Sequence, residues 1–321
     1  MKATNPATGE QLAVYDEHDD EDVEEILATA QSTFEEWQDV PLREREQLLV
    51  NAGEVLRENK EKYATLMTEE MGKPISEARA EVEKCAWACD HYAEYASAYL
   101  SADHHPSPPG TEVKTVHDPL GPVLAVMPWN FPFWQVIRFA APYVTAGNVG
   151  LLKHASNVPG CALALEEVFE EAGYPEGVFQ TMLVGSGKIE GVLEDDRVRA
   201  ATLTGSGPAG RAVAETAGRN LKKTVLELGG SDPFVVLDDA DIEAAVETGV
   251  TARNQNGGQS CIAAKRFIVH TDVYDEYVDK LVDAFEGLTI GDPTDEATDM
   301  GPQADADLMA ELHEQVEGSI E

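Results

Sequence analysis

The middle of this chain alternates short β-type apolar runs with amphipathic helical patterns, and this alternation constrains the fold more than any other feature. The candidate strands are 122–127, 149–153, 179–184, 200–203, 224–228 and 233–237. The helical patterns between them, with apolar residues at three- and four-residue spacing, are 133–145, 158–172, 187–194, 208–217 and 242–255. Strands joined by helices run parallel, and helices then cover both faces of their sheet. The pattern predicts an α/β fold with a Rossmann-like parallel sheet, whose ligands bind at the carboxyl ends of the strands.

A helix-rich segment precedes the predicted sheet. Helical periodicity covers residues 20–37, 42–71 and 75–100. Residues 104–110, which begin with two histidines and contain several prolines, indicate a turn-rich connector. A chain of 321 residues is long enough for about two domains. We therefore expect the parallel sheet to be followed by a second unit.

Acidic residues far outnumber basic ones, with 60 Asp and Glu against 23 Lys and Arg and a formal net charge of −37. A surface of this sign repels nucleic acid and anionic membranes, so we expect neither as a partner. The acid is spread along the chain, which predicts a surface suited to high salt, where screening removes most self-repulsion. The sequence shows no apolar run long enough to span a membrane and no secretion signal, so we expect a cytoplasmic protein.

Four cysteines occur, and only one of them follows a pair of glycines. Cys85, Cys89 and Cys161 form no CxxC pair, which argues against a metal site or disulfide framework and favours buried, reduced thiols. Cys261 follows Gly257-Gly258-Gln259-Ser260, where the backbone can bend and other groups can approach closely. Cys261 is therefore the candidate functional cysteine.

A glycine motif, GSGPAG at 205–210, follows a candidate strand and opens a helix. A helix N-terminus there offers free N–H groups to a pyrophosphate, although a lone GxGxxG also fits a plain strand-to-helix turn. Glu227 lies at the spacing of an acid that binds a ribose. It also ends a strand before Gly229-Gly230, which suits a catalytic carboxylate, while an ion-paired surface acid is a third interpretation.

Five motifs then occur in one order along the chain: PWNFP at 128–132, Lys153, GSG at 205–207, LELGG at 226–230 and GGQSC at 257–261. In this order and at these separations the chain resembles the aldehyde dehydrogenase superfamily, and most closely its succinate-semialdehyde dehydrogenases. The resemblance covers essentially the whole chain. It implies NAD(P)-dependent oxidation of an aldehyde to a carboxylic acid.

The resemblance also implies three catalytic residues. Cys261 is the nucleophile, because an aldehyde gives up hydride readily only after addition, and a thiolate both adds and leaves well. The side-chain amide of Asn130 and the backbone N–H of Cys261 stabilise the resulting oxyanion. Glu227 is the general base that activates water to hydrolyse the acyl-enzyme, which sets aside the ribose-binding interpretation.

Cofactor residues follow from the same resemblance. Lys153 corresponds to the lysine that contacts the adenosine ribose, and Gly205 and Ser206 to the start of the pyrophosphate-binding helix, with Trp129 beside them. Ser156 stands where strictly NAD-using members often carry a glutamate. A carboxylate there repels a 2′-phosphate and a serine does not, so we expect NADP to be accepted as well as NAD.

The substrate assignment rests on two positions. Arg138 matches the arginine that clamps the substrate carboxylate in succinate-semialdehyde dehydrogenases, and a guanidinium suits a planar carboxylate. An arginine that simply extends from its helix into solvent is the alternative. A second arginine of part of that group is here Gln255. The expected substrate is therefore succinate semialdehyde or a related short aldehyde.

The chain keeps the family pattern to its last residues but is shorter than the family's usual members, so we expect a C-terminally truncated member. The dinucleotide-binding domain is expected at 1–227, with the N-terminal helices and a connector at 101–120, and the N-terminal part of the catalytic domain at 228–321. Full-length members of the family form homo-oligomers, which leaves the assembly of this chain open.

Three functions remain open from the sequence. The first is the dehydrogenase, and the second is a nucleotide-binding fragment without turnover. The third is a cysteine hydrolase or acyltransferase in which Cys261 works with His270 or His154.

Overall fold

A computed structural model describes residues 1–320, and Glu321, the last residue of the expected catalytic part, lies outside the described residues. Its centre is a five-stranded parallel sheet. The strand order is β7 (Phe179–Thr181), β6 (Val149–Lys153), β5 (Pro122–Val126), β8 (Ala200–Gly205) and β9 (Lys223–Leu228). This arrangement confirms the predicted α/β class.

The sheet is buried most deeply at its centre, which explains the apolar runs that predict it. Every residue of β6 is buried, and β5 and β8 are buried except at their last residues. Strands covered on both faces become continuously apolar rather than alternating. At the edge of the sheet, β9 carries exposed and half-buried residues in alternation. The strand that carries Glu227 is therefore the open side of the sheet.

Helices connect the strands and cover the sheet. The crossovers are α5 (Trp134–Thr145), α6 (Pro159–Glu171), η1 (Ser186–Lys188) with α7 (Ile189–Glu194), and α8 (Gly207–Arg219). The N-terminal helices are α1 (Asp20–Trp37), α2 (Leu42–Glu58), α3 (Lys60–Met71) and α4 (Ile75–Tyr99). Helix α4 packs along α2, α3 and α5. The long α4 thus reaches from the helical layer to the start of α5, next to the strand ends.

The single helix expected over 42–71 is wrong, because the structure has two helices that meet at Asn59. The Asn59 backbone leaves helical geometry at φ −100° and ψ 17°. Its side chain donates to the carbonyl of Val55 and to Glu171. Asparagine side chains compete in this way with helical hydrogen bonding, which explains the break.

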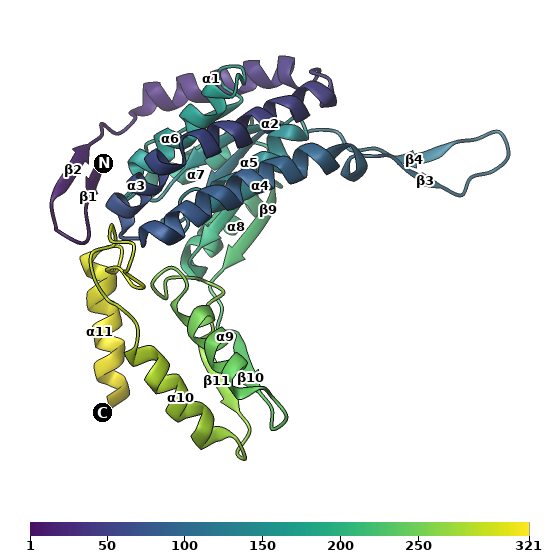
Figure 1. The fold of residues 1–321 in the computed structure, drawn as a ribbon. Coiled ribbons are helices and arrows are strands. Elements are labelled where there is room, and N and C mark those ends of the chain that lie inside the picture. Colours follow the sequence, from purple (N-terminus) through teal and green to yellow (C-terminus); the bar gives the residue numbers. More distant parts are fainter. Residues whose placement is uncertain (321) are drawn as a thin grey trace.

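The connector expected over 104–110 is also more ordered than predicted. Strands β3 (Asp103–His105) and β4 (Val113–Thr115) pair antiparallel as a hairpin that projects from the body (Figure 1). A second hairpin that the sequence analysis missed joins β1 (Lys2–Thr4) to β2 (Gln11–Val14). Both hairpins have short strands, and β3 and β4 are exposed throughout. Strands of three residues carry too little alternation to be recognised from sequence.

A smaller unit follows the sheet. Strands β10 (Pro233–Val236) and β11 (Arg266–Val269) run parallel and are joined by α9 (Ile242–Asn254), with α10 (Tyr274–Glu286) packed on α9. Val236, Val246 and Tyr277 form a separate hydrophobic cluster there. The chain then returns to the first body, where Ala304 is buried in the main core, and ends in α11 (Ala306–Ile320). Within residues 1–320, no helix has the length and apolar character needed to cross a membrane.

Candidate active site

A cavity of about 400 Å³ lies at the carboxyl ends of the sheet strands. Its walls come from the loop after β5, the ends of β8 and β9, the loop before β11, and the segment that leads into α11. The lining includes Trp129, Asn130, Gly205, Ser206, Glu227 and Cys261. The carboxyl ends of parallel strands meet at one edge of a sheet, which is why residues far apart in sequence converge there.

Cys261 is half-buried in this cavity, on a loop with left-handed backbone geometry. Three consecutive residues before it have positive φ: Asn256 at 58°, Gly257 at 60° and Gly258 at 77°. Glycine adopts this geometry without strain, and asparagine tolerates it better than other residues. The pair of glycines is therefore required by the turn that brings Cys261 to the strand ends. The ammonium of Lys265 donates to the Cys261 carbonyl at 2.5 Å and holds the far side of the loop.

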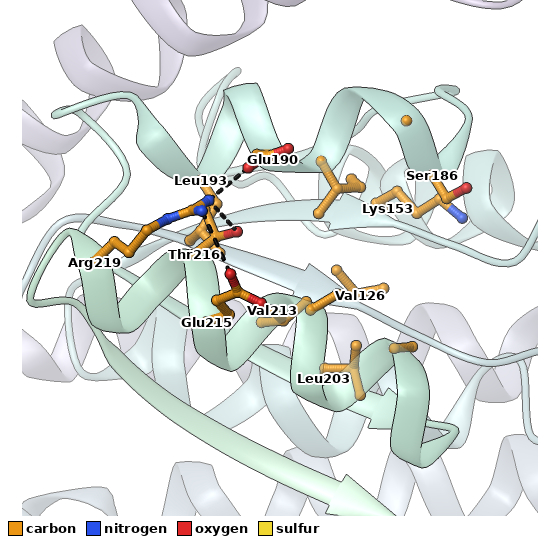
Figure 2. A pocket seen from close by; sticks show the side chains of 14 residues that line it. Val126, Lys153, Ser186, Glu190, Leu193, Leu203, Val213, Glu215, Thr216 and Arg219 are labelled. Atoms are coloured by element: carbon orange, nitrogen blue, oxygen red, sulfur yellow. Dashed lines mark hydrogen bonds and ion pairs between the residues drawn. The ribbon is translucent and has the colours of Figure 1, made fainter.

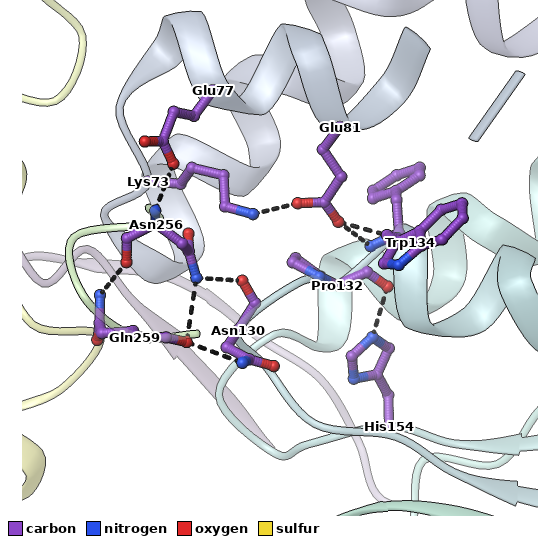
Figure 3. A network of polar contacts seen from close by, with 10 residues as sticks. Lys73, Glu77, Glu81, Asn130, Pro132, Trp134, His154, Asn256 and Gln259 are labelled. Atoms are coloured by element: carbon purple, nitrogen blue, oxygen red, sulfur yellow. Dashed lines mark hydrogen bonds and ion pairs between the residues drawn. The ribbon is translucent and has the colours of Figure 1, made fainter. Parts of the chain in front are cut away.

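Asn130 has a fixed side-chain amide. Its side-chain Nδ2 donates one hydrogen to the backbone carbonyl of Gln259 at 2.8 Å, and the backbone carbonyl of Asn130 accepts from Asn256 Nδ2 at 2.6 Å (Figure 3). An amide nitrogen carries two hydrogens, so a second N–H of Asn130 remains available. The amide is thus pre-oriented by the loop that carries Cys261.

Glu227 enters the same cavity from the edge strand. In the sheet register, it lies beside Thr204 of β8, and Leu228 lies beside Gly205. The side chain of Glu227 is exposed, so water reaches its carboxylate. The Glu227 carboxylate, which can accept a proton, and the half-buried thiol of Cys261 therefore line the same cavity.

The glycine motif opens α8 as the sequence analysis expects. Ser206 is the N-cap residue, and its Oγ accepts from the Ala209 N–H at 3.4 Å. A Cβ at Gly210 would lie 2.6 Å from Leu228 Cδ2, so this glycine lets α8 lie close to β9. Pro208 has no N–H and Ala209 donates to Ser206, so the Gly207 N–H and the positive end of the helix dipole are what this N-terminus offers to an anion.

A second cavity, of about 360 Å³, lies between α7 and α8 (Figure 2). Val126, Leu203 and Val213 give it an apolar wall, and Lys153 lines it from the end of β6. Burial lowers the pKa of the Lys153 ammonium. At another part of the lining, Arg219 is held by Glu190 at 2.5 Å. Lys153 has no carboxylate partner within residues 1–320, which leaves its charge available to a ligand.

Three of the predicted site residues lie apart from both cavities. Ser156 is exposed just after β6, and Arg138 is half-buried on α5. Gln255 is exposed at the C-cap of α9 and lines a different hollow, together with Thr251 and Leu288. The two cavities therefore bring together the residues predicted to be catalytic and most of those predicted to bind the cofactor, but not those predicted to bind the substrate carboxylate.

The two histidines considered as partners of Cys261 do not line its cavity. His154 is buried, with Nε2 3.0 Å from the Pro132 carbonyl and Nδ1 accepting from the Ala155 N–H at 2.8 Å. This pattern fixes the neutral tautomer that carries its hydrogen on Nε2, and burial lowers the His154 pKa to about 4. His270 sits beyond β11 and contacts Asp272. Neither histidine is placed to take a proton from the thiol.

Sequence reasoning missed a polar network behind the cavity (Figure 3). Its members are Lys73, Glu77, Glu81, Asn256 and Gln259. Gln259 belongs to the GGQSC motif, and asparagine before two glycines, as at Asn256, favours a left-handed turn, but the other three members carry no signal in the sequence. The two glutamates look like ordinary helix charges in so acidic a chain, and Lys73 looks like an ordinary lysine in the break between α3 and α4.

Comparisons with known proteins agree with this geometry. A model of the aldehyde dehydrogenase family matches residues 1–321. A probable succinate-semialdehyde dehydrogenase (NADP+) from Synechocystis sp. is 52% identical over 316 residues, which are 98% of this chain and 69% of that relative. Succinate-semialdehyde dehydrogenase (NADP+) 1 from Mycobacterium tuberculosis is 50% identical over 320 residues, with the same two shares.

Solved structures are equally similar in fold. The crystal structure of succinic semialdehyde dehydrogenase from Streptococcus pyogenes in complex with NADP+ has a TM-score of 0.96 and 36% identity. The match covers 98% of this chain and 70% of that one. The expected family resemblance is therefore confirmed along the whole chain. This chain belongs to the aldehyde dehydrogenase family.

Proposed function

We propose that this protein oxidises a short aldehyde, succinate semialdehyde or a close analogue with a carboxylate, to the corresponding acid with NADP or NAD as acceptor. The observation that carries the proposal is the convergence of Cys261, Asn130 and Glu227 on one cavity at the strand ends. The substrate class is supported by the names of the two sequence relatives, which are succinate-semialdehyde dehydrogenases that use NADP+.

The chain's own residues suit a dinucleotide. The apolar wall of Val126, Leu203 and Val213 fits an adenine ring, and the N-terminus of α8 offers the Gly207 N–H and the positive end of the helix dipole to a pyrophosphate. Lys153, buried and without a carboxylate partner in the described chain, would hold a ribose hydroxyl or phosphate. When bound, the nicotinamide supplies the acceptor for the hydride that the substrate loses.

Cys261 performs the first covalent step. Its Sγ, as thiolate, adds to the carbonyl carbon, and the carbonyl oxygen becomes an oxyanion. That oxyanion accepts from the free N–H of Asn130 and from the backbone N–H of Cys261. Each such donor contributes roughly 10²–10³ in rate when it is pre-oriented. The Gln259 carbonyl provides this orientation by holding the other hydrogen of the Asn130 amide.

Glu227 performs the release step. After hydride loss, the acyl group is bound to Cys261 as a thioester. The carboxylate of Glu227 takes a proton from water, the water oxygen attacks the acyl carbon, and the C–S bond breaks to return the thiolate. The exposed position of Glu227 supports this role, because the attacking water must come from solvent.

The choice of substrate and dinucleotide is assigned to two residues outside the cavities. Arg138, half-buried on α5 and without an ion-pair partner in residues 1–320, would bind the substrate carboxylate. Ser156, exposed after β6, carries no charge and so does not repel the 2′-phosphate of NADP. Gln255, the second position of the substrate assignment, is exposed at the C-cap of α9 and lines a different hollow.

The same proposal divides the chain by function. Residues 1–227 hold the dinucleotide, and residues 228–321 supply the nucleophile. A separate hydrophobic cluster around Val236 and Tyr277 supports this division for the part of the chain that contains β10, α9, β11 and α10, whereas Ala304, further along, packs in the main core.

The test measures NADP reduction with succinate semialdehyde in the parent protein and in Cys261→Ala. We expect the variant to lose at least about 10⁴-fold in turnover, because removing a catalytic nucleophile costs that much or more, and to keep NADP affinity. His270→Ala, an exposed residue outside the cavity, is the control and should retain the parent rate.

Three other results would contradict the proposed dehydrogenase or favour one of the alternative functions. NADP reduction by Cys261→Ala at the parent rate would reject the nucleophile. Dinucleotide binding by the parent without turnover of any aldehyde would favour a nucleotide-binding function. Ester hydrolysis without dinucleotide that is lost in His270→Ala would favour the hydrolase.

A further inference from the structure

Helix α4 directs two carboxylates toward the loops of the active site. Glu77 and Glu81 are one helical turn apart and therefore share a face of the helix. Glu81 is 4% exposed, and Glu77 is partly buried. Burial raises the pKa of Glu77, although the hydrogen bond that it accepts from the Asn256 backbone N–H acts in the opposite direction. Carboxylates are seldom buried unless they have specific partners, so the partners identify what these two residues do.

Glu81 holds the segment that follows Asn130. Its Oε1 accepts from the N–H groups of Phe133 and Trp134, each at 2.9 Å (Figure 3). These amides begin α5, whose N-cap residue makes no side-chain cap. Helix N-termini leave such N–H groups without partners, and a carboxylate satisfies both their hydrogen bonds and the helix dipole. Glu81 thus fixes where α5 starts, directly after the Asn130 loop.

Lys73 completes this side of the arrangement. Its ammonium pairs with Oε2 of Glu81, and the lysine is 1% exposed. The same ammonium lies 4.1 Å from the centre of the Phe131 ring, next to Asn130. One buried lysine and one buried glutamate therefore hold the Asn130 loop through Phe131 and the start of α5.

Glu77 holds the other loop. Its Oε2 accepts from the Asn256 backbone N–H at 2.7 Å. Asn256 in turn donates from Nδ2 to the Asn130 carbonyl at 2.6 Å, and its left-handed backbone begins the turn to Cys261. Glu77 therefore anchors the nucleophile loop to the same helix face that anchors the Asn130 loop.

We infer that Glu77 and Glu81 are positioning residues, and that one turn of α4 sets the separation between the oxyanion donor Asn130 and the nucleophile Cys261. The inference rests on the proposed function for what that separation does. Neither carboxylate lines the cavity, so both act through the two loops rather than on the substrate. Misplacing a reacting group by about 1 Å costs about 10²-fold in rate, which is the size of effect at stake.

The decisive variant is Glu81→Gln. An amide has one accepting oxygen, so it satisfies the α5 amides only by turning its NH₂ toward the Lys73 ammonium, and two donors then face each other. We expect kcat for succinate semialdehyde to fall by roughly 10- to 100-fold, with the Kd for NADP unchanged because α8 is not contacted. Glu83→Gln on the same helix, whose exposed carboxylate pairs with Arg57, is the control and should retain kcat.

A second variant separates positioning from simple loss of an ion pair. Lys73→Met alone leaves Glu81 buried without its cation and should also lower kcat. In the double variant, Lys73→Met with Glu81→Gln, the clash of donors disappears and the glutamine oxygen again accepts from α5. We expect the double variant to recover most of the kcat that Glu81→Gln loses.

Glu77→Gln keeps an accepting oxygen for Asn256, whereas Glu77→Ala removes it. We therefore expect near-parent kcat in Glu77→Gln and a loss of roughly 10-fold in Glu77→Ala, measured well below the unfolding temperature of each variant. Parent-like kcat in both Glu81→Gln and Glu77→Ala would overturn the inference. So would a loss of NADP binding that parallels the loss of kcat, since that indicates general disorder.

Backbone amide hydrogen exchange tests the inference without depending on catalytic activity. If the parent oxidises no aldehyde, the proposed function fails, and amide exchange then decides the inference. We expect the amides of Phe133 and Trp134 to exchange faster in Glu81→Gln, and that of Asn256 to do so in Glu77→Ala. Unchanged protection in these variants would overturn the positioning role whatever the activity of the parent.

Discussion

The two cavities differ in what holds their walls. The one between α7 and α8 is lined by regular elements, with Val126 and Leu203 on buried strands and Val213 on a helix. The one around Cys261 is lined mainly by loops, which are held by side chains such as Asn256 from outside the cavity. The first therefore depends on the sheet core, and the second on a few hydrogen bonds. This difference predicts that single substitutions will separate dinucleotide binding from turnover.

Asn130→Ala is the substitution in the Cys261 cavity with the largest expected effect on turnover. The side chain supplies the proposed oxyanion donor, so we expect kcat for succinate semialdehyde to fall by roughly 10²–10³-fold. The Kd for NADP should stay within about twofold, because the cavity between α7 and α8 does not include Asn130. Steady-state kinetics and dinucleotide titration measure the two quantities. Asn220→Ala, at the exposed C-cap of α8, is the control for asparagine removal.

An equal loss of NADP affinity in Asn130→Ala would contradict the difference between the cavities. A kcat within twofold of the parent would instead remove Asn130 from the chemistry.

His154 lies next to residues of both cavities, and its protonation predicts how the stability of the fold depends on pH. It follows β6 and Lys153, and it donates from Nε2 to the Pro132 carbonyl, in the loop after β5 that lines the Cys261 cavity. Its pKa is about 4 in the fold, because burial disfavours the charged form, against about 6.5 when unfolded. Between these values the unfolded chain binds more protons. The free energy of unfolding therefore falls as pH drops from 6.5 to 4, by about 3 kcal/mol at pH 4.

His154→Gln should remove that dependence. A glutamine keeps a donor for Pro132 and an acceptor for Ala155 but does not titrate, so the difference in free energy between pH 7 and pH 4 should shrink by about 3 kcal/mol relative to the parent. Urea unfolding at both pH values measures it. His117→Gln, exposed in the connector, is the control. The same pH dependence in parent and His154→Gln would show that His154 is not the group responsible.

The sequence could predict where ligands bind because its motifs lie at strand ends. Parallel strands joined by helices bring their carboxyl ends together, so Asn130, Ser206, Glu227 and Cys261 were expected to meet and do line one cavity. The motifs identified these residues because each has a backbone signature: a turn, a helix start or a glycine pair. The core strands β5, β6 and β8 were equally visible as apolar runs.

The sequence could not predict how the loops are held. Glu77 and Glu81 come from a helix far earlier in the chain, and only the packing of α4 on α5 brings them to the site. In a chain with 60 acidic residues, one buried and one partly buried carboxylate cannot be told from the solvated ones by composition or periodicity. The short hairpin strands and the break between α2 and α3 at Asn59 were not predicted for a similar reason, since their sequence signals are local and weak.

Arg138 extends the comparison to the substrate. It lies on α5, just beyond the segment that Glu81 holds, and is half-buried without an ion-pair partner in residues 1–320. We expect Arg138→Ala to raise the KM for succinate semialdehyde by roughly 10- to 100-fold, the value of a hydrogen bond to a charged group. The KM for an uncharged aldehyde such as butanal should change little. Arg43→Ala, exposed on α2, controls for loss of a positive charge.

An unchanged KM for succinate semialdehyde in Arg138→Ala would reject the carboxylate assignment without affecting the role of Cys261. An equal rise for butanal would mean that Arg138 supports the fold of α5 rather than the substrate.

Ser156→Glu tests the dinucleotide side alone and has the smallest expected effect. The residue is exposed after β6, two positions beyond His154 and outside the Cys261 cavity. A carboxylate there should repel a 2′-phosphate, and a like-charge contact of about 1.4 kcal/mol raises the KM for NADP about tenfold while that for NAD stays the same or falls. Because no loop of the Cys261 cavity is touched, kcat should not change. Ser32→Glu, which adds the same charge on the exposed surface of α1, separates this local repulsion from the general effect of one more negative charge on an already acidic protein. An equal rise in the KM for NADP in both variants would assign the effect to the overall field, and Ser156 would then have no part in choosing between the two dinucleotides.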